Sequence, residues 1–108
     1  MDLAPARGRR LHVWVCTHDR TAAADRNLPS CGPAGAGAVF DALHAWVAAR
    51  GAYALIQVTR SGCQGWCNAD GCSVTFWPQG DTWRRVTVDD VPTLCERYLR
   101  PALDGRSA

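Results

Sequence analysis

The stretch GPAGAGAVFDALHAWVAARGAYALIQVT, residues 32–59, has the pattern of a helix followed by a strand. From Ala36 to Arg50 apolar side chains recur at helical spacing, and Gly51 follows as a stop. Residues 53–59 form the next apolar run, and Leu11–Cys16 is an earlier run rich in β-branched and aromatic residues. The order strand, helix, strand predicts a parallel βαβ unit. The apolar face of the helix consists of Val39, Phe40, Leu43, Trp46 and Val47.

A hairpin and a second helix are predicted downstream of this unit. Apolar residues alternate from Cys72 to Trp77, the letters PQGD at 78–81 form a turn, and TWRRVTV returns over residues 82–88. The last helix begins near residues 89–92 (DDVP), and Pro101 limits its length. Its apolar face consists of Val91, Leu94, Cys95, Tyr98 and Leu99. The predicted fold is therefore α/β (α+β) and thioredoxin-like: a four-stranded mixed sheet with two main helices, in the order β-α-β-(cysteine loop)-β-β-α.

The composition predicts one soluble globular domain. The chain has 108 residues, of which 47% are hydrophobic and 20% charged, and this is ordinary globular usage. We expect the domain to span residues 10–103, between flexible tails at 1–9 and 104–108. The formal net charge is +2, and the basic residues are all arginines scattered along the chain. This distribution gives no sign of a nucleic-acid partner.

The sequence shows neither an export signal nor a membrane helix. The run LHVWVC, residues 11–16, is too short for a signal-peptide core, and no run approaches the roughly 20 apolar residues of a membrane helix. We therefore expect a cytoplasmic protein with no membrane partner. Cytoplasmic thiols stay reduced, so six cysteines point to metal or redox chemistry before disulfides.

The segment SGCQGWCNADGC, residues 61–72, holds three of the six cysteines. Cys63 and Cys67 follow the second predicted strand, Cys16 ends the first, and Cys31 lies in the loop after it. Because the C-terminal ends of parallel strands meet at one edge of a sheet, these four thiols can converge. Four thiolates suit either tetrahedral zinc or an iron–sulfur cluster. Fourteen residues separate the first two thiols, whereas zinc modules favour two short arms, so the spacing weakens the zinc interpretation but leaves it open.

The residues around these thiols suit a negatively charged cluster. Glycines let backbone N–H groups approach sulfur, where they stabilise and tune a cluster. Arginines flank the ligand positions and either offset the cluster charge or are solvated surface side chains. The glycines are Gly62, Gly65 and Gly71, and the arginines are Arg20, Arg26 and Arg60.

Together these motifs resemble the thioredoxin-like [2Fe–2S] ferredoxins, the group that includes the Shethna-type proteins. The resemblance rests on VWVCTHDR (13–20), SCG before the first helix (30–32), SGCQGWC (61–67), the hairpin SVTFWPQGDTWRRV (73–86) and TVDDVPTLCERYL (87–99). It implies that Cys16, Cys31, Cys63 and Cys67 bind a [2Fe–2S] cluster. It also implies a homodimer whose activity is one-electron transfer between redox partner proteins.

Two features depart from that family. Asp70, Gly71 and Cys72 stand where family members have a proline and an apolar residue. Cys72 therefore either packs as a small buried residue or replaces Cys31 or Cys67 as a ligand. The loop before Cys31 is also slightly long, so Cys31 is the ligand most open to replacement.

The remaining candidate residues have ordinary structural interpretations. Cys95 falls on the apolar face of the last helix, as expected for an inert core thiol. His18 follows Cys16 by two residues, but the sequence lacks the second Cys-His arm that a Rieske site needs. His12 and His44 are expected at surface positions of the first strand and the first helix. Trp66, inside the C-x3-C motif, either shields the cluster, presents a docking surface or packs in the ordinary way.

No catalytic set competes with the thiols. The sequence has no Ser-His-Asp order, no Gly-rich phosphate loop and no C-x-x-C motif, and Asp89 and Asp90 suit a helix start. We therefore expect no enzyme. The predicted function is that of a ferredoxin, a one-electron carrier with a [2Fe–2S] cluster. The alternatives are a Cys-ligated zinc module and a cluster-free thiol protein that senses oxidation through Cys63 or Cys67.

Overall fold

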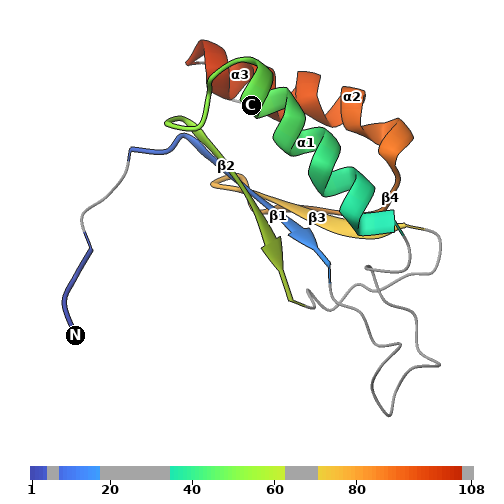
Figure 1. Cartoon of the computed structure of the whole chain (residues 1–108), viewed down its shortest axis with the longest axis horizontal. Helices are drawn as coiled ribbons and strands as arrows, with labels where there is room; N and C mark the ends of the chain where they lie inside the picture. Colours follow the sequence, from blue (N-terminus) through green and yellow to red (C-terminus); the bar gives the residue numbers. More distant parts are fainter. Residues whose placement is uncertain (5–7, 18–34, 63–70, 106–108) are drawn as a thin grey trace.

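The structure is a computed structural model that describes residues 1–4, 8–17, 35–62 and 71–105. Its sheet has four strands in the spatial order β2-β1-β3-β4 (Figure 1). Strand β1 runs parallel to β2 and antiparallel to β3, and β3 forms a hairpin with β4. The predicted mixed sheet and its order of elements are therefore confirmed. The strands are β1 (Leu11–Cys16), β2 (Ile56–Ser61), β3 (Cys72–Trp77) and β4 (Asp81–Val86).

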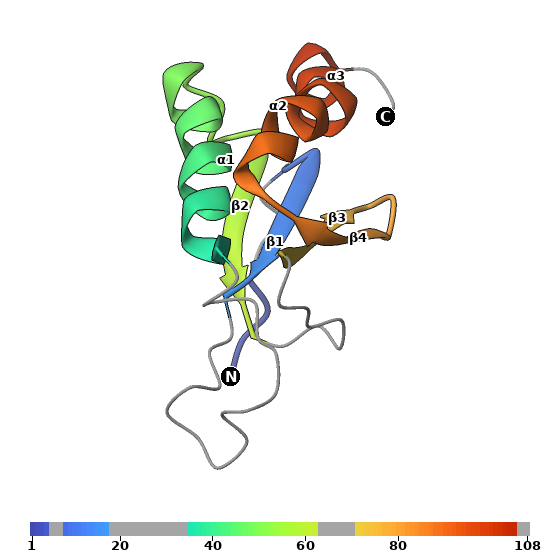
Figure 2. The same ribbon diagram turned by 90° about the vertical axis from the view of Figure 1, so that its right-hand side faces the viewer.

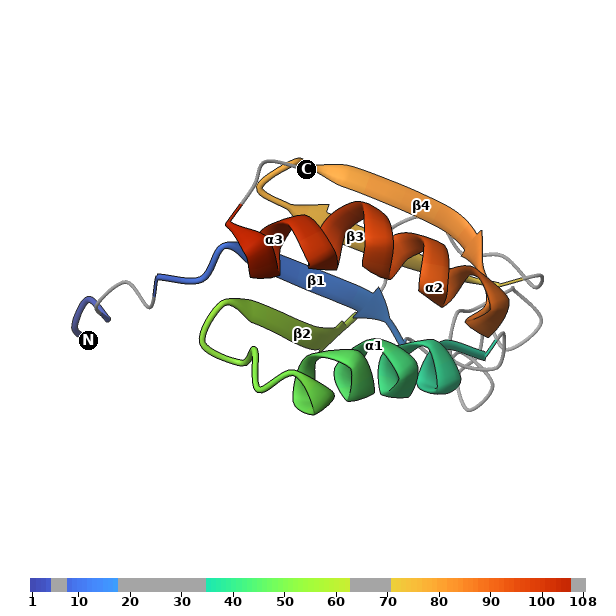
Figure 3. The same ribbon diagram turned by 90° about the horizontal axis from the view of Figure 1, so that it is seen from above.

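The helices of the described residues all cover one face of the sheet (Figures 2 and 3). Helix α1 spans Gly37–Ala49, and a 3₁₀ turn over Val88–Asp90 leads into α2 (Val91–Leu94). A π-helical turn, Cys95–Leu99, joins α2 to α3 (Arg100–Asp104). Pro101 therefore does not stop the last helix, because it occupies the first turn of α3, where its missing N–H is tolerated. None of the described helices is long and apolar enough to span a bilayer.

The core lies between this face and the helices. Alternate residues of β1, namely Leu11, Val13 and Val15, are fully buried, as strand geometry predicts for a half-covered sheet. Phe76 of β3 stacks on Tyr98 with ring centroids 3.9 Å apart and an 8° interplanar angle. Burying each such side chain stabilises the fold by about 1.5–3 kcal/mol. The core side of α1 consists of Val39, Leu43 and Val47, at the predicted helical spacing.

Gly51 ends α1, as the sequence predicts. It has φ 60°, which a glycine adopts without steric cost, and its N–H donates to the carbonyl of Ala48. The next N–H, of Ala52, donates to the carbonyl of Val47, which completes a Schellman cap. The chain then makes another turn, in which the N–H of Leu55 donates to the carbonyl of Ala52. This turn explains why β2 begins at Ile56 rather than at residue 53 as predicted.

Strand β4 carries one extra residue against β3. Val74 pairs with Trp83 and Cys72 pairs with Val86, so two steps along β3 face three steps along β4. This bulge lets both Trp83 and Val86 turn toward the helices, whereas strict alternation would turn Arg85 inward.

The bulge needs an unusual backbone at two positions. Arg85 has φ 57°, in the left-handed region that costs an ordinary residue about 1–2 kcal/mol. Gly71 lies against it, and a Cβ at this glycine would be 2.5 Å from the carbonyl carbon of Arg85. Since real Cβ atoms do not approach backbone so closely, only glycine fits at position 71.

The opposite face of the sheet is not covered by any helix of the described residues (Figure 2). Its register places His12 opposite Trp77 and Trp14 opposite Thr75. The rings of His12 and Trp14 stack with centroids 5.5 Å apart, and Trp77 is 54% exposed. This face therefore carries large aromatic side chains in contact with solvent.

Candidate functional site

Several element ends meet at one edge of the sheet, which we call the rim. It consists of the C-terminal ends of β1 and β2, the start of β3, the end of β4 and the N-terminus of α1 (Figure 3). The pairing agrees, because Cys16 lies opposite Ser61 and Cys72 lies opposite Val86. A parallel βαβ unit produces this arrangement, since its helix runs back against the strands.

Cys16 is the last residue of β1 and lies at the rim. Its side chain is fully buried. Just beyond it, the N–H of Thr17 donates to the carbonyl of Ser61 at 3.1 Å, and the Thr17 hydroxyl is 3.5 Å from the same oxygen. The ends of β1 and β2 are thereby held together next to the thiol. Cys16 is thus a buried sulfur on a rigid element, as a metal ligand should be.

Cys31, Cys63 and Cys67 lie outside the described residues, and so do Arg20, Arg26, His18 and Trp66. The described chain nevertheless meets those segments at the rim, because Thr17 follows β1, Gly62 follows β2 and Gly71 precedes β3. Among residues 1–4, 8–17, 35–62 and 71–105, no three histidine, cysteine or carboxylate side chains form a group that could hold a metal. Of the four predicted ligands, the structure therefore gives a position to Cys16 alone.

Solved ferredoxin structures share this architecture. The thioredoxin-like [2Fe–2S] ferredoxin from Aquifex aeolicus is 26% identical, matches 93% of this chain and 92% of its own, and superposes with a TM-score of 0.73. The chain has the fold of the thioredoxin-like [2Fe–2S] ferredoxins. The resemblance seen in the sequence is confirmed, although no family model and no curated protein matches the chain.

Two cysteine-to-serine variants of the same ferredoxin match as well. One is 26% identical over 83% of this chain and 87% of its own, and the other is 25% identical over 91% and 92%. Both superpose with a TM-score of 0.72. The two substituted cysteines are four positions apart in that protein, which is also the separation of Cys63 and Cys67 in this chain.

Cys72 and Cys95 are both buried within this ferredoxin fold. Cys72 is fully buried and shares the helix-facing side of β3 with Val74 and Phe76. Cys95 is 2% exposed, as predicted for a core thiol, and burial raises the pKa of its thiol from 9.0 to about 11. A thiol with so high a pKa is protonated at neutral pH and is a poor nucleophile.

Arg60 is near the rim but is engaged with α1. Its guanidinium carbon lies 4.1 Å from the centroid of the Phe40 ring, and its Nη2 is 3.7 Å from a carboxylate oxygen of Asp41. The exposed pair contributes little to stability. The N-terminus of α1 is the other source of positive potential here, because a helix carries about half a positive charge at its N-terminal end.

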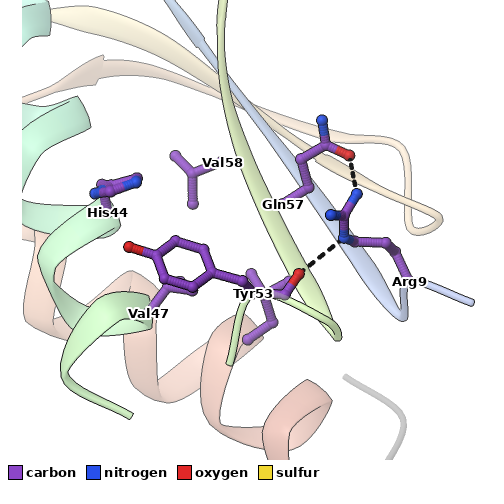
Figure 4. A pocket seen from close by; sticks show the side chains of 7 residues that line it. Arg9, His44, Val47, Tyr53, Gln57 and Val58 are labelled. Carbon is purple, nitrogen blue, oxygen red and sulfur yellow. Dashed lines mark hydrogen bonds between the residues drawn. The ribbon is translucent and has the colours of Figure 1, made fainter. Parts of the chain in front are cut away.

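A pocket of about 300 Å³ lies at the other end of the sheet, beside the start of β2 (Figure 4). Arg9 donates from Nε to the carbonyl of Tyr53 at 2.9 Å and from Nη1 to Oε1 of Gln57 at 2.6 Å. His44 stacks on Phe40, with centroids 5.7 Å apart, and its ring meets Tyr53 at 52°. The described residues that line the pocket include no thiol, so it does not contribute to a cysteine-ligated centre.

Sequence reasoning missed a cationic groove beside the rim. Arg84, Arg85 and Arg97 line it together with Trp83. The available signal was the spacing in β4, where the inward residues Trp83 and Val86 are three positions apart instead of two. A break of this kind in an alternating strand indicates a bulge.

Proposed function

We propose that this chain is a one-electron carrier rather than an enzyme, and that Cys16, Cys31, Cys63 and Cys67 hold a [2Fe–2S] cluster. The observation that carries the proposal is the fold that this chain shares with thioredoxin-like [2Fe–2S] ferredoxins. Within this fold, the buried Cys16 of this chain lies at the rim. Cys63 and Cys67 are four positions apart, as are the two substituted cysteines of the Aquifex aeolicus ferredoxin, and this supports the same ligand set. When bound, the cluster takes up and releases one electron.

The chain's own residues suit such a group. Thiolate is the ligand that iron–sulfur clusters use, and burial of Cys16 keeps water away from that sulfur. A four-thiolate [2Fe–2S] centre is anionic, so the partial positive charge at the N-terminus of α1 would favour a cluster held at the rim. The hydrogen bond from Thr17 to Ser61 fixes the strand ends on which the ligand depends. No residue here needs to move a proton, which suits an electron carrier.

Cys72 is proposed as a packing residue rather than a ligand. Its side chain shares the inward face of Val74 and Phe76, whereas Cys16 continues the alternation of His12 and Trp14. In regular strands, these two sulfurs belong to opposite faces of the sheet. A common metal centre for both would need the end of one strand to rotate.

Metal analysis with single serine variants tests the proposal. We expect brown protein after anaerobic purification, with two irons and two acid-labile sulfides per chain and a paramagnetic signal after reduction by dithionite. Serine at Cys16, Cys31, Cys63 or Cys67 should lower cluster retention. Serine at Cys95 is the matched control, because this thiol is buried and lies near Arg50 at the far end of α1.

Three outcomes contradict parts of this proposal. Colourless protein with one zinc per chain would assign a zinc module, and protein that holds neither metal after reconstitution with iron and sulfide would assign a thiol protein. If the Cys72→Ser variant loses the cluster and the Cys31→Ser variant keeps it, Cys72 rather than Cys31 is the fourth ligand.

The proposed carrier is a homodimer that uses the sheet face left uncovered by the helices of the described residues. Trp77 and the stacked pair of His12 and Trp14 give this face aromatic area that a second copy can cover. Sedimentation should therefore give twice the mass of one chain, and Trp77→Ser should weaken the association. A chain that stays monomeric at every concentration would contradict the proposed homodimer but not the proposed electron-carrier function.

A further inference from the structure

A groove of about 320 Å³ is lined by β4 and by the helical segment that runs from Asp90 through α2 to Arg97. Three arginines line it, and Trp83 forms part of its wall. Val86 and Leu94 are buried at its base. The groove therefore combines an apolar floor, an aromatic wall and cationic sides. The three arginines are Arg84, Arg85 and Arg97, and we call this feature the arginine groove.

The charge of the arginine groove is strongly one-sided. Among the residues that the structure describes, three guanidinium groups and one carboxylate, that of Asp90, line the groove. Asp90 is already used, because one of its oxygens accepts from the backbone N–H of Thr87 at 2.9 Å and lies 3.3 Å from the Thr87 hydroxyl. The nearby Asp81 accepts from the Tyr98 hydroxyl at 2.6 Å. An additional anionic group is therefore favoured in this groove.

The bulge in β4 assembles the groove. In a regular strand, consecutive side chains point to opposite faces, so Arg84 and Arg85 would not line one depression. The extra residue breaks this alternation, and both arginines reach the groove. Arg85 adopts a left-handed backbone that glycine adopts without steric cost, and such strained positions cluster at functional sites.

Aromatic support orients the third arginine. The guanidinium carbon of Arg97 is 5.2 Å from the Trp83 ring centroid and 5.5 Å from that of Tyr98. Trp83 is held in turn, since its Nε1 donates to the Tyr98 hydroxyl at 2.8 Å. A guanidinium beside an aromatic plane keeps its outward N–H groups for a carboxylate, which it binds in a two-pronged geometry.

We infer that the arginine groove is the docking site for an acidic segment of a partner protein. Aspartate or glutamate side chains would pair with Arg85 and Arg97, while an apolar residue between them would cover Trp83. The groove lies next to Val86, which pairs with Cys72 at the rim. A docked partner would thus lie beside the end of the sheet that carries Cys16. Its assignment as a redox partner rests on the proposed function, whereas the docking surface does not.

A labelled short peptide of alternating glutamate and leucine is a direct probe, with the glutamine version of the peptide as its neutral control. The peptide should bind the purified protein at low salt, and binding should weaken at physiological salt. Arg85→Gly keeps the backbone angle and removes the charge, and Arg97→Gln removes the charge beside Trp83. Together they should weaken binding by about tenfold or more.

The matched control is Arg50→Gln combined with Arg100→Gln. These arginines also lie over an aromatic ring, that of Trp46, at 3.9 and 5.3 Å, and their replacement removes the same total charge. We expect less than about a twofold change in peptide binding from this pair. An equal loss in both double variants, or equal binding of the glutamine peptide, would overturn the docking site.

Two further measurements separate the possible failures. Tighter binding to phosphatidylserine vesicles or to an oligonucleotide, lost in the same groove variants, would overturn the assignment to an acidic protein segment. The cluster content of each variant is measured in parallel. If the protein binds the peptide but holds no cluster, the electron-carrier proposal is contradicted and the docking site is supported. If the protein holds the cluster but does not bind the peptide, the docking site is contradicted and the electron-carrier proposal is supported.

Discussion

Replacing Gly71 by alanine tests the bulge that shapes both the rim and the arginine groove. The new Cβ would lie 2.5 Å from the carbonyl carbon of Arg85, 2.8 Å from its Cα and 2.7 Å from the carbonyl oxygen of Val86. All three are backbone atoms, which cannot rotate away as a side-chain tip can. We therefore expect the upper end of overpacking costs, about 3 kcal/mol of unfolding free energy. For a domain of this size, that loss lowers the melting temperature by about 10–15 °C.

The assay is thermal and urea unfolding followed by far-ultraviolet circular dichroism. Gly37→Ala is the matched control, because a Cβ there meets nothing within 4 Å and the residue begins α1. Alanine is the better helix former, so this variant should keep or slightly raise the stability. A Gly71→Ala protein that melts within about a degree of the parent protein would refute the close approach at Arg85, because 1 kcal/mol alone shifts the melting temperature by several degrees.

Three other predictions follow from the described contacts. Tyr98→Phe removes the hydroxyl that joins Trp83 to Asp81 and should lower the unfolding free energy by about 1–2 kcal/mol in urea titrations. An unchanged unfolding free energy would mean that these two hydrogen bonds do not stabilise the fold. Arg10→Ala removes the donor to the Ala102 carbonyl at 3.0 Å, so it should cost about 1 kcal/mol in the same titration, whereas an unchanged midpoint would mean that α3 needs no such cap. Burial raises the pKa of Cys95 to about 11, so its stabilising contribution is present below pH 9 and lost between pH 9 and 11. Urea midpoints of the parent protein and Cys95→Ala should converge or cross in that window, and parallel pH profiles would contradict the shift.

The periodic elements were predictable because their patterns are local. The spacing of Val39, Leu43 and Val47 fixes the buried side of α1, and alternation fixes the inward residues of β1. The start of β2 was not predictable in this way. Tyr53 and Leu55 have strand-like side chains, but both lie in the turn that follows the cap at Gly51, where the N–H of Leu55 donates to the carbonyl of Ala52. The strand propensity of these residues is therefore overridden by the hydrogen-bonded turn that follows α1, and β2 begins later than their side chains predict.

The site was predictable only as far as topology determines it. The βαβ order places Cys16 at the rim, and the structure agrees. Whether Cys72 packs or ligates depends on which face of β3 it occupies, and this requires the strand register. The bulge needed still more information, because it follows from a contact between Gly71 and Arg85, fourteen positions apart in the sequence. Cys31, Cys63 and Cys67 remain predictions from the sequence.

The single extra residue in β4 connects the structural and the functional arguments. It turns Trp83 and Val86 toward the helices, brings two successive arginines to one groove, and pairs Val86 with Cys72 at the rim. Arg85→Gly removes one charge while the left-handed backbone becomes easier to adopt, so it should weaken acidic-peptide binding and raise stability together. Gly71→Ala attacks the same bulge through its backbone and should lower both. If Arg85→Gly raises stability and Gly71→Ala lowers it, while both weaken peptide binding, then binding depends on the arginine charge and on the backbone geometry of the bulge rather than on overall stability.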